Sequence, residues 1–175
     1  QYFKELTTAI KKVDCEHLHD AALLIKETSE KGSKLIIAGN GGSAAMASHV
    51  AVDFTKAAQI RAINFNESDL ITCFANDYGY ENWVKEALNA YADPDDLVIL
   101  ISSSGQSANI INAAKRAPEL GLHLITFSGF SQHNPLRSLG EINFWIDSNN
   151  YNYVEMTHHI WLLAICDFII SNKQI

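Results

Sequence analysis

The chain has 175 residues, 47% of them hydrophobic and 19% charged, so its length suits a single domain with a substantial core. Its net charge of −7 excludes nucleic acid as the direct partner, because a phosphate backbone requires basic patches, but leaves open a small phosphorylated ligand. No apolar run approaches about 20 residues, no signal peptide is visible and the three cysteines are widely spaced, so we expect a cytoplasmic protein without a membrane partner.

The first 32 residues are predicted to form two helices. Apolar residues recur at helical spacing over 2–31, Asp14 is placed to N-cap the second helix, and Gly32 is placed to end it. These helices precede the first strand, so a minimal doubly wound domain offers them no partner. We therefore expect residues 1–32 to form a helical arm that packs against another copy of the chain in a homo-oligomer.

A buried strand over 35–38 is followed by Gly39-Asn40-Gly41-Gly42-Ser43. The glycines allow a sharp turn and a close approach to a ligand. We expect Ser43 at the N-cap of a helix over 43–57, where free backbone N–H groups and the helix dipole attract an anion. The spacing matches neither a dinucleotide-binding motif nor a P-loop.

A second polar loop follows a second buried strand. Residues 97–101 are continuously apolar, and Ser102-Ser103-Ser104-Gly105-Gln106-Ser107 leads into a helix over 108–120. Four hydroxyls at the start of a helix can hold one phosphate. An ordinary N-cap with a solvated loop is the alternative. Because ligands bind outside the carboxyl ends of parallel strands, we expect the two loops to form one anion site.

The other predicted elements alternate in the same way. They are a strand over 61–65, helices over 67–75 and 81–91 with a turn at Asn76-Asp77-Tyr78-Gly79 between them, strands over 123–127 and 142–146, and a largely apolar helix over 152–170. Alternating strands and helices predict a five-stranded parallel sheet covered by helices on both faces. The fold class is therefore α/β, a three-layer α/β/α domain spanning residues 1–175.

The sequence resembles the sugar isomerase (SIS) domain family, and within it the phosphoheptose isomerases. The resemblance is carried by Gly39-Asn40-Gly41-Gly42-Ser43, by Ala75-Asn76-Asp77-Tyr78-Gly79 and by Ile101-Ser102-Ser103-Ser104-Gly105-Gln106-Ser107-Ala108-Asn109. It implies a flavodoxin-like fold, a homotetramer, and an isomerase that converts sedoheptulose 7-phosphate into an aldose phosphate for lipopolysaccharide or capsule heptose. It also implies that the catalytic sites combine residues of neighbouring subunits.

An aldose–ketose isomerase moves a proton between two carbons and needs a base and an acid near them. In the resembled isomerases a His and, four residues later, a Glu base follow the glycine turn, and here these positions hold His49 and Asp53. Asp keeps the carboxylate but has a shorter reach. The alternatives are a solvated helix position for Asp53 and a hydrogen-bonded interface histidine for His49.

The last helix departs from the family pattern. Glu155 stands where the family has Gln, His158 matches the first His, and Leu163 replaces a second His that looks catalytic and zinc-binding in the family. Glu155 and His158 are three residues apart, so both are predicted on one helical face as base and acid of a rearranged site. His159 points about 100° away from His158, and we expect it to serve packing.

The predicted binding residues are of two kinds. Asn76 and Asp77 are expected to hold substrate hydroxyls, with plain turn formation as the alternative. The phosphate is assigned to Asn40, Gly41, Gly42, Ser43, Ser102, Ser103, Ser104 and Ser107. We expect no required cofactor. A zinc ion held by His49, Asp53 and Glu155, with His158 or His159, remains the alternative.

Two other functions compete with a phosphoheptose isomerase. A non-catalytic phosphosugar-binding protein of the same fold, such as the DnaA initiator-associating protein, would need no second imidazole, and Leu163 and Asp53 favour it. An isomerase or epimerase for another sugar phosphate would use a site rebuilt around Glu155. The Glu155-x-x-His158 pair opposes the purely binding function.

Overall fold

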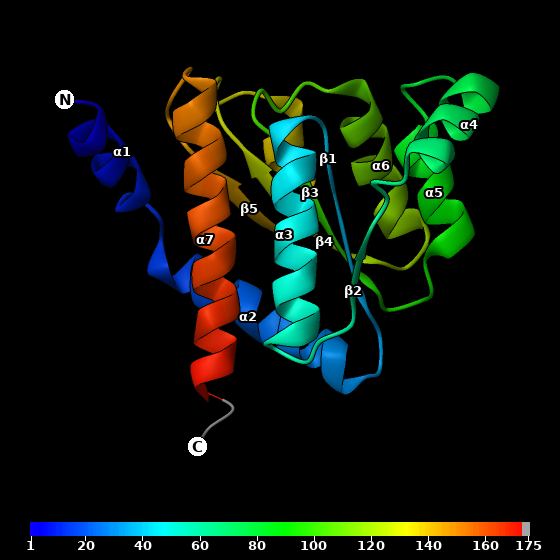
Figure 1. Cartoon of the computed structure of the whole chain (residues 1–175), viewed down its shortest axis with the longest axis horizontal. Helices are drawn as coiled ribbons and strands as arrows, with labels where there is room; N and C mark the ends of the chain where they lie inside the picture. The colour runs from blue at the N-terminus through cyan, green and yellow to red at the C-terminus, as the bar shows by residue number, and fades with distance from the viewer. Residues whose placement is uncertain (173–175) are drawn as a thin grey trace.

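The computed structural model describes residues 1–172 and contains a five-stranded parallel sheet of order β2-β1-β3-β4-β5 (Figure 1). The strands are β1 (Leu35–Gly39), β2 (Ala62–Asn64), β3 (Leu97–Ser102), β4 (His123–Ser128) and β5 (Ile142–Trp145). Every neighbouring pair is parallel. The structure thus confirms the predicted sheet, and its order is that of flavodoxin-like folds.

Helices cover both faces of the sheet. They are α1 (Tyr2–Ile10), α2 (Cys15–Glu30), α3 (Gly42–Lys56), α4 (Ser68–Tyr78), α5 (Trp83–Tyr91), α6 (Ala108–Glu119), the 3₁₀ helix η1 (Pro135–Ser138) and α7 (Tyr151–Asn172). Helices α2, α3 and α7 enclose one core, and α5, α6 and η1, with the inner side of α4, enclose the other. In Figure 1, α3 and α7 run side by side over one face. The three-layer prediction is confirmed.

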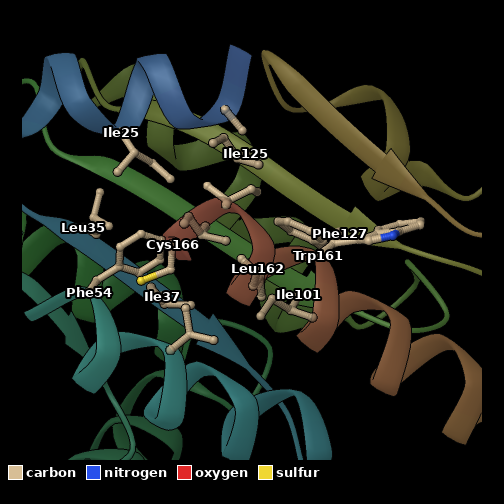
Figure 2. Close-up of a cluster of buried hydrophobic side chains, with 14 of the residues drawn as sticks. Ile25, Leu35, Ile37, Phe54, Ile101, Ile125, Phe127, Trp161, Leu162 and Cys166 are labelled. Carbon is tan, nitrogen blue, oxygen red and sulfur yellow. The ribbon is translucent and has the colours of Figure 1, made fainter. Parts of the chain in front are cut away.

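Strands β1 and β3 are apolar except for Ser102 at the end of β3, because both of their faces are covered. All residues of β1 and β3 are buried, and successive side chains enter opposite cores. Leu35 and Ile37 pack in the core under α2, α3 and α7, while Ile36 and Ala38 pack in the other. Figure 2 shows Leu35 and Ile37 among Phe54 of α3 and the apolar side chains of α7.

The N-terminal segment only partly forms an arm. Asp14 accepts a hydrogen bond from the Glu16 N–H and caps α2, as predicted. However, α2 buries Ala21, Ala22 and Ile25 against the sheet and packs on α7 and β5. The expectation that both helices lack a partner inside the domain is therefore wrong, because α1 also contacts α7, where Trp161 Nε1 donates to the Ile10 carbonyl at 3.0 Å. Helix α1 buries no residue and lies at the edge of the fold (Figure 1).

Helix α7 meets the length and composition of a membrane span, with a mean hydropathy of 1.3 in its most apolar window. The sequence prediction did not recognise a segment of this length and hydropathy, because polar residues such as Glu155 and His158 interrupt the apolar run. Eight residues of α7 are buried, and they pack on α1, α2 and α3. This is the packing of a core helix.

Two local predictions need correction. Gly41, at φ +54°, is the N-cap of α3, and Ser43 is already inside the helix. Helix α4 continues through Asn76 and Asp77 and ends at Gly79, whose φ of +82° suits glycine. The predicted turn is therefore the last turn of a helix.

Candidate functional site

The two polar loops lie next to each other at the carboxyl edge of the sheet. Strands β1 and β3 are hydrogen-bonded neighbours, and Gly39, the last residue of β1, pairs with Ile101, one residue before the end of β3. The chain leaves β1 into α3 on one face and leaves β3 into α6 on the other. This divergence is the topological switch point at which open α/β sheets bind ligands.

A cavity of about 290 Å³ lies between these loops. Its lining combines the two loops with the first turns of α7: Asn40, Gly41, Gly42, Ser43, Ile101, Ser102, Ser103, Ser104, Ser107, Tyr151 and Glu155. The structure thus brings together all eight residues to which the sequence assigned the phosphate. Tyr151 was missed, and no signal in the sequence marks it.

The cavity is rich in hydrogen-bond donors but has no basic side chain among its lining residues. Ser102 Oγ lies 3.1 Å from Ser107 Oγ, and Ser104 Oγ accepts from the Gln106 N–H. The hydroxyl of Ser103 is buried and has no partner within residues 1–172. Helices α3 and α6 begin at this edge, so their N-terminal N–H groups and dipoles supply the positive potential.

A pair of amides joins the two loops. Asn40 Nδ2 donates to Asn109 Oδ1 at 2.9 Å, and Asn109 Nδ2 donates back to Asn40 Oδ1 at 2.8 Å. The Tyr80 hydroxyl also donates to Asn40 Oδ1, at 3.2 Å. Neither Asn109 nor Tyr80 is among the predicted site residues, although Asn109 closes the serine-loop motif. Together these contacts hold the loop after β1 against the start of α6.

Glu155 projects from α7 into the cavity. A Cβ on Gly42 would collide with its carboxylate, and Glu155 Oε1 would lie 2.9 Å from that atom. Gly42 is therefore needed for space rather than for backbone conformation. Of the predicted catalytic side chains, Glu155 alone lines the cavity.

His49 and Asp53 lie farther along α3 and do not line the cavity. His49 Nε2 is 3.2 Å from Asp53 Oδ2, and both side chains are partly exposed. The His49 ring also stands at 83° to the His159 ring of α7, with 4.8 Å between the ring centroids. Burial, followed by the neighbouring His49, lowers the pKa of His159. His159 thus packs across the α3–α7 contact.

His158 lies in the core and does not accompany Glu155 to the cavity. Its side chain is fully buried, its Nε2 donates to the Ser128 carbonyl at 2.9 Å, and its ring contacts Phe127 and Trp161. Burial lowers its pKa to about 4. The prediction that Glu155 and His158 face one site is wrong, because the three-residue spacing leaves an angle large enough to divide cavity from core.

The structure also separates the other predicted ligands. Asn76 and Asp77 are exposed at the end of α4, where Asn76 Nδ2 donates to Asp77 Oδ1, and neither lines the cavity. Within residues 1–172, no three His, Cys, Asp or Glu side chains are close enough to hold a metal ion. The alternative zinc set of His49, Asp53 and Glu155 is therefore not assembled, and Leu163 packs against the core.

Comparison with known proteins identifies the family. The SIS domain model matches residues 1–129. The chain belongs to the SIS domain family. It is 34% identical over 164 residues to the phosphoheptose isomerase of Aliarcobacter butzleri, covering 90% of this chain and 86% of that protein. The SIS fold is equally clear in three dimensions. A phosphoheptose isomerase structure, GmhA from Neisseria gonorrhoeae, superposes with a TM-score of 0.90 at 28% identity, over 97% of this chain and 95% of that one.

A structure of a phosphoheptose isomerase from Francisella tularensis gives a TM-score of 0.89 at 25% identity, over 98% of this chain and 95% of that one. Within the SIS family, the chain therefore belongs with the phosphoheptose isomerases, as the resemblance of its loops implied.

Proposed function

We propose that this SIS protein is an aldose–ketose isomerase acting on D-sedoheptulose 7-phosphate, forming D-glycero-D-manno-heptose 7-phosphate. The observation that carries the proposal is the hydroxyl-lined cavity between the β1–α3 and β3–α6 loops. It occurs in a chain whose similarity to phosphoheptose isomerases extends over nine-tenths of its length. Fold alone would not identify the reaction, but fold, loops and relatives agree.

In this proposal the substrate phosphate binds at the N-termini of α3 and α6. The serine hydroxyls and the free N–H groups of the first helical turns donate to its oxygens. The unpartnered hydroxyl of Ser103 is one donor already present and unused. The Asn40–Asn109 pair keeps the two halves of the cradle at a fixed separation.

The proton transfer is assigned first to Glu155. A base must take a proton from C1 of the ketose and return one to C2 of the enediol, so a carboxylate close to the bound sugar is required. Glu155 is the carboxylate among the residues that line the cavity. His49 and Asp53 remain candidates for a site completed by another subunit, since their side chains are partly exposed on α3.

No metal is required in this proposal, because the nearest potential ligands of the described chain do not converge. Activity that survives a chelator during purification and assay would support this view. Activity that appears only with added zinc would contradict it and would assign His49 and Asp53 to a metal site.

We further propose a cytoplasmic homotetramer that supplies heptose for lipopolysaccharide or capsule. Helix α1 offers an unburied surface for assembly, with Phe3 81% exposed. On α3, Val52 is 59% exposed, next to Asp53. Isolated large apolar side chains on a surface are common, but one on α1, which packs on α7, and one on α3, which begins at the cavity, favour contacts between copies.

The test is an isomerase assay in D₂O with the full chain and sedoheptulose 7-phosphate. We expect an aldose phosphate, and incorporation of solvent deuterium at C2 of the product would identify an enediol. A Ser102→Ala, Ser104→Ala double variant is expected to raise KM strongly. Turnover in D₂O without deuterium at C2 would contradict enediol exchange with solvent.

A sugar-phosphate-binding protein without catalysis is the second candidate. Leu163 and the buried His158 favour it, because the described cavity contains no imidazole. Binding of sedoheptulose 7-phosphate without turnover, with and without zinc, would support this candidate. Complex formation with a replication initiator would then place it with the DnaA-associating relatives.

A further inference from the structure

The carboxylate of Glu155 is in an unusual place. It lies against Gly42 at the N-terminus of α3, inside the cavity to which we assign the substrate phosphate. No hydrogen bond or ion pair holds it within residues 1–172. It is also the sole charged side chain among those that line the cavity. An anion-binding cradle therefore contains an unpaired anion of its own.

This arrangement has different consequences for different ligands. A bare phosphate dianion entering the cradle meets a like charge, which opposes its binding in a partly buried site. A ligand that carries hydroxyl groups beside its phosphate can donate hydrogen bonds to the same carboxylate. Hydrogen bonds to a charged acceptor are stronger than those between neutral groups.

We propose that Glu155 determines specificity by penalising bare phosphate and rewarding the hydroxyl-bearing chain of a sugar phosphate. This inference rests on the proposed function, because it assumes that the cradle binds the phosphate of a sugar. Discrimination by an unfavourable contact with the wrong ligand is a general means to specificity. The glycine at position 42 is consistent with this role of Glu155, because a side chain there would displace the carboxylate.

This selectivity is a second role of Glu155, beside the proton transfer already assigned to it, and the two roles can be measured separately. A base acts on the reacting carbons, and its loss lowers kcat. The selectivity proposed here is a property of binding alone, and it applies equally to a ligand that cannot react. It can therefore be measured with a heptitol 7-phosphate, the reduced substrate, which has no carbonyl group and cannot isomerise.

The experiment compares three proteins by calorimetric titration with inorganic phosphate and with heptitol 7-phosphate. They are the wild type, Glu155→Gln, and Glu30→Gln as a matched change of charge at the exposed end of α2. We expect the wild type and Glu30→Gln to prefer heptitol phosphate by 100-fold or more. In Glu155→Gln, phosphate should bind at least 10-fold more tightly and the preference should fall at least 10-fold.

The outcomes separate the two proposals. An unchanged preference in a folded Glu155→Gln variant overturns the selectivity role and leaves the proposed function standing. A wild type that binds neither inorganic phosphate nor heptitol 7-phosphate would contradict the proposed function itself. Methyl phosphate tests the proposal in the wild type, without any variant, because its dianion is a phosphate ester with no hydroxyl group to donate to Glu155. It should bind as weakly as inorganic phosphate, and binding as tight as that of heptitol phosphate also overturns the proposal.

Discussion

Asn40 and Asn109 exchange two hydrogen bonds, of 2.9 and 2.8 Å, between the loop after β1 and the first turn of α6. Asn109 is 2% exposed, and Asn40 is partly buried. The pair thus fixes the distance between the two halves of the proposed phosphate cradle. Each amide donates to the other and accepts from it, so loss of Asn109 leaves the Asn40 donor without its partner, while Asn40 Oδ1 keeps the hydrogen bond from Tyr80.

Replacing Asn109 by Ala is expected to raise KM about 10-fold and to change kcat less, because a displaced cradle weakens binding before it affects the proton transfer. The partly buried amide of Asn40 loses both hydrogen bonds to Asn109 and keeps the one from Tyr80, so stability should fall by about 1–3 kcal/mol. Steady-state kinetics and denaturant unfolding measure the two effects. Asn112→Ala, which removes an exposed bond to the Glu81 carbonyl, is the control and should leave KM unchanged.

Replacing Gly42 by Ala is expected to destabilise the protein by about 1–3 kcal/mol, because the new methyl group collides with the Glu155 carboxylate. In a Glu155→Ala background the same change should be neutral or slightly stabilising, since Ala favours a helix over Gly. Unfolding free energies of the four proteins form a double-mutant cycle. Additive effects would show that the two residues do not share this space.

The fold could be predicted because the pattern that specifies it is local. The apolar runs 35–38 and 97–101 and the glycines that follow them depend on a few neighbouring residues, and the structure has strands and loops at those places. Parallel strands place their carboxyl ends at one edge of the sheet, and the two loops meet there because β1 and β3 are neighbours. This is why the sequence yielded all eight proposed phosphate ligands.

The catalytic residues could not be placed in the same way. Glu155 and His158 lie on the same turn of α7, but Glu155 lines the cavity and His158 is buried in the core. Which of them reaches the cavity depends on how α7 packs on the sheet, and only tertiary packing determines that. The contact of His159 with His49 depends on how α7 packs against α3. The partner of Asn40 lies 69 residues away, and only the fold brings them together.

Glu155→Gln is expected to lower kcat by about 10²–10⁴-fold, the range for loss of a general base. Asp53→Asn should lower it less, because Asp53 pairs with His49 outside the cavity. Initial rates at saturating substrate compare the two variants, with Glu30→Gln as the control. A larger loss of kcat for Asp53→Asn would identify Asp53 of α3 as the base and would favour a site completed by a second subunit.

Acidification should destabilise the protein through His158. Its pKa is lowered from 6.5 to about 4 by burial. Its Nε2 donates to the Ser128 carbonyl, and its Nδ1 is buried with no acceptor for a second proton within residues 1–172. Between pH 6.5 and about 4 the unfolded chain therefore binds a proton that the folded chain does not, so stability present above pH 6.5 is lost as the pH falls.

The full contribution over this interval is about 3 kcal/mol for one group. Urea unfolding at pH 7 and at pH 4.5 measures it for the wild type and for His158→Gln, which keeps a donor for Ser128 but does not titrate. The variant should lose less stability on acidification, whatever its stability at pH 7. His19→Gln removes an exposed imidazole from α2 and is the control. Equal losses in wild type and His158→Gln would show that His158 does not resist protonation in the folded protein.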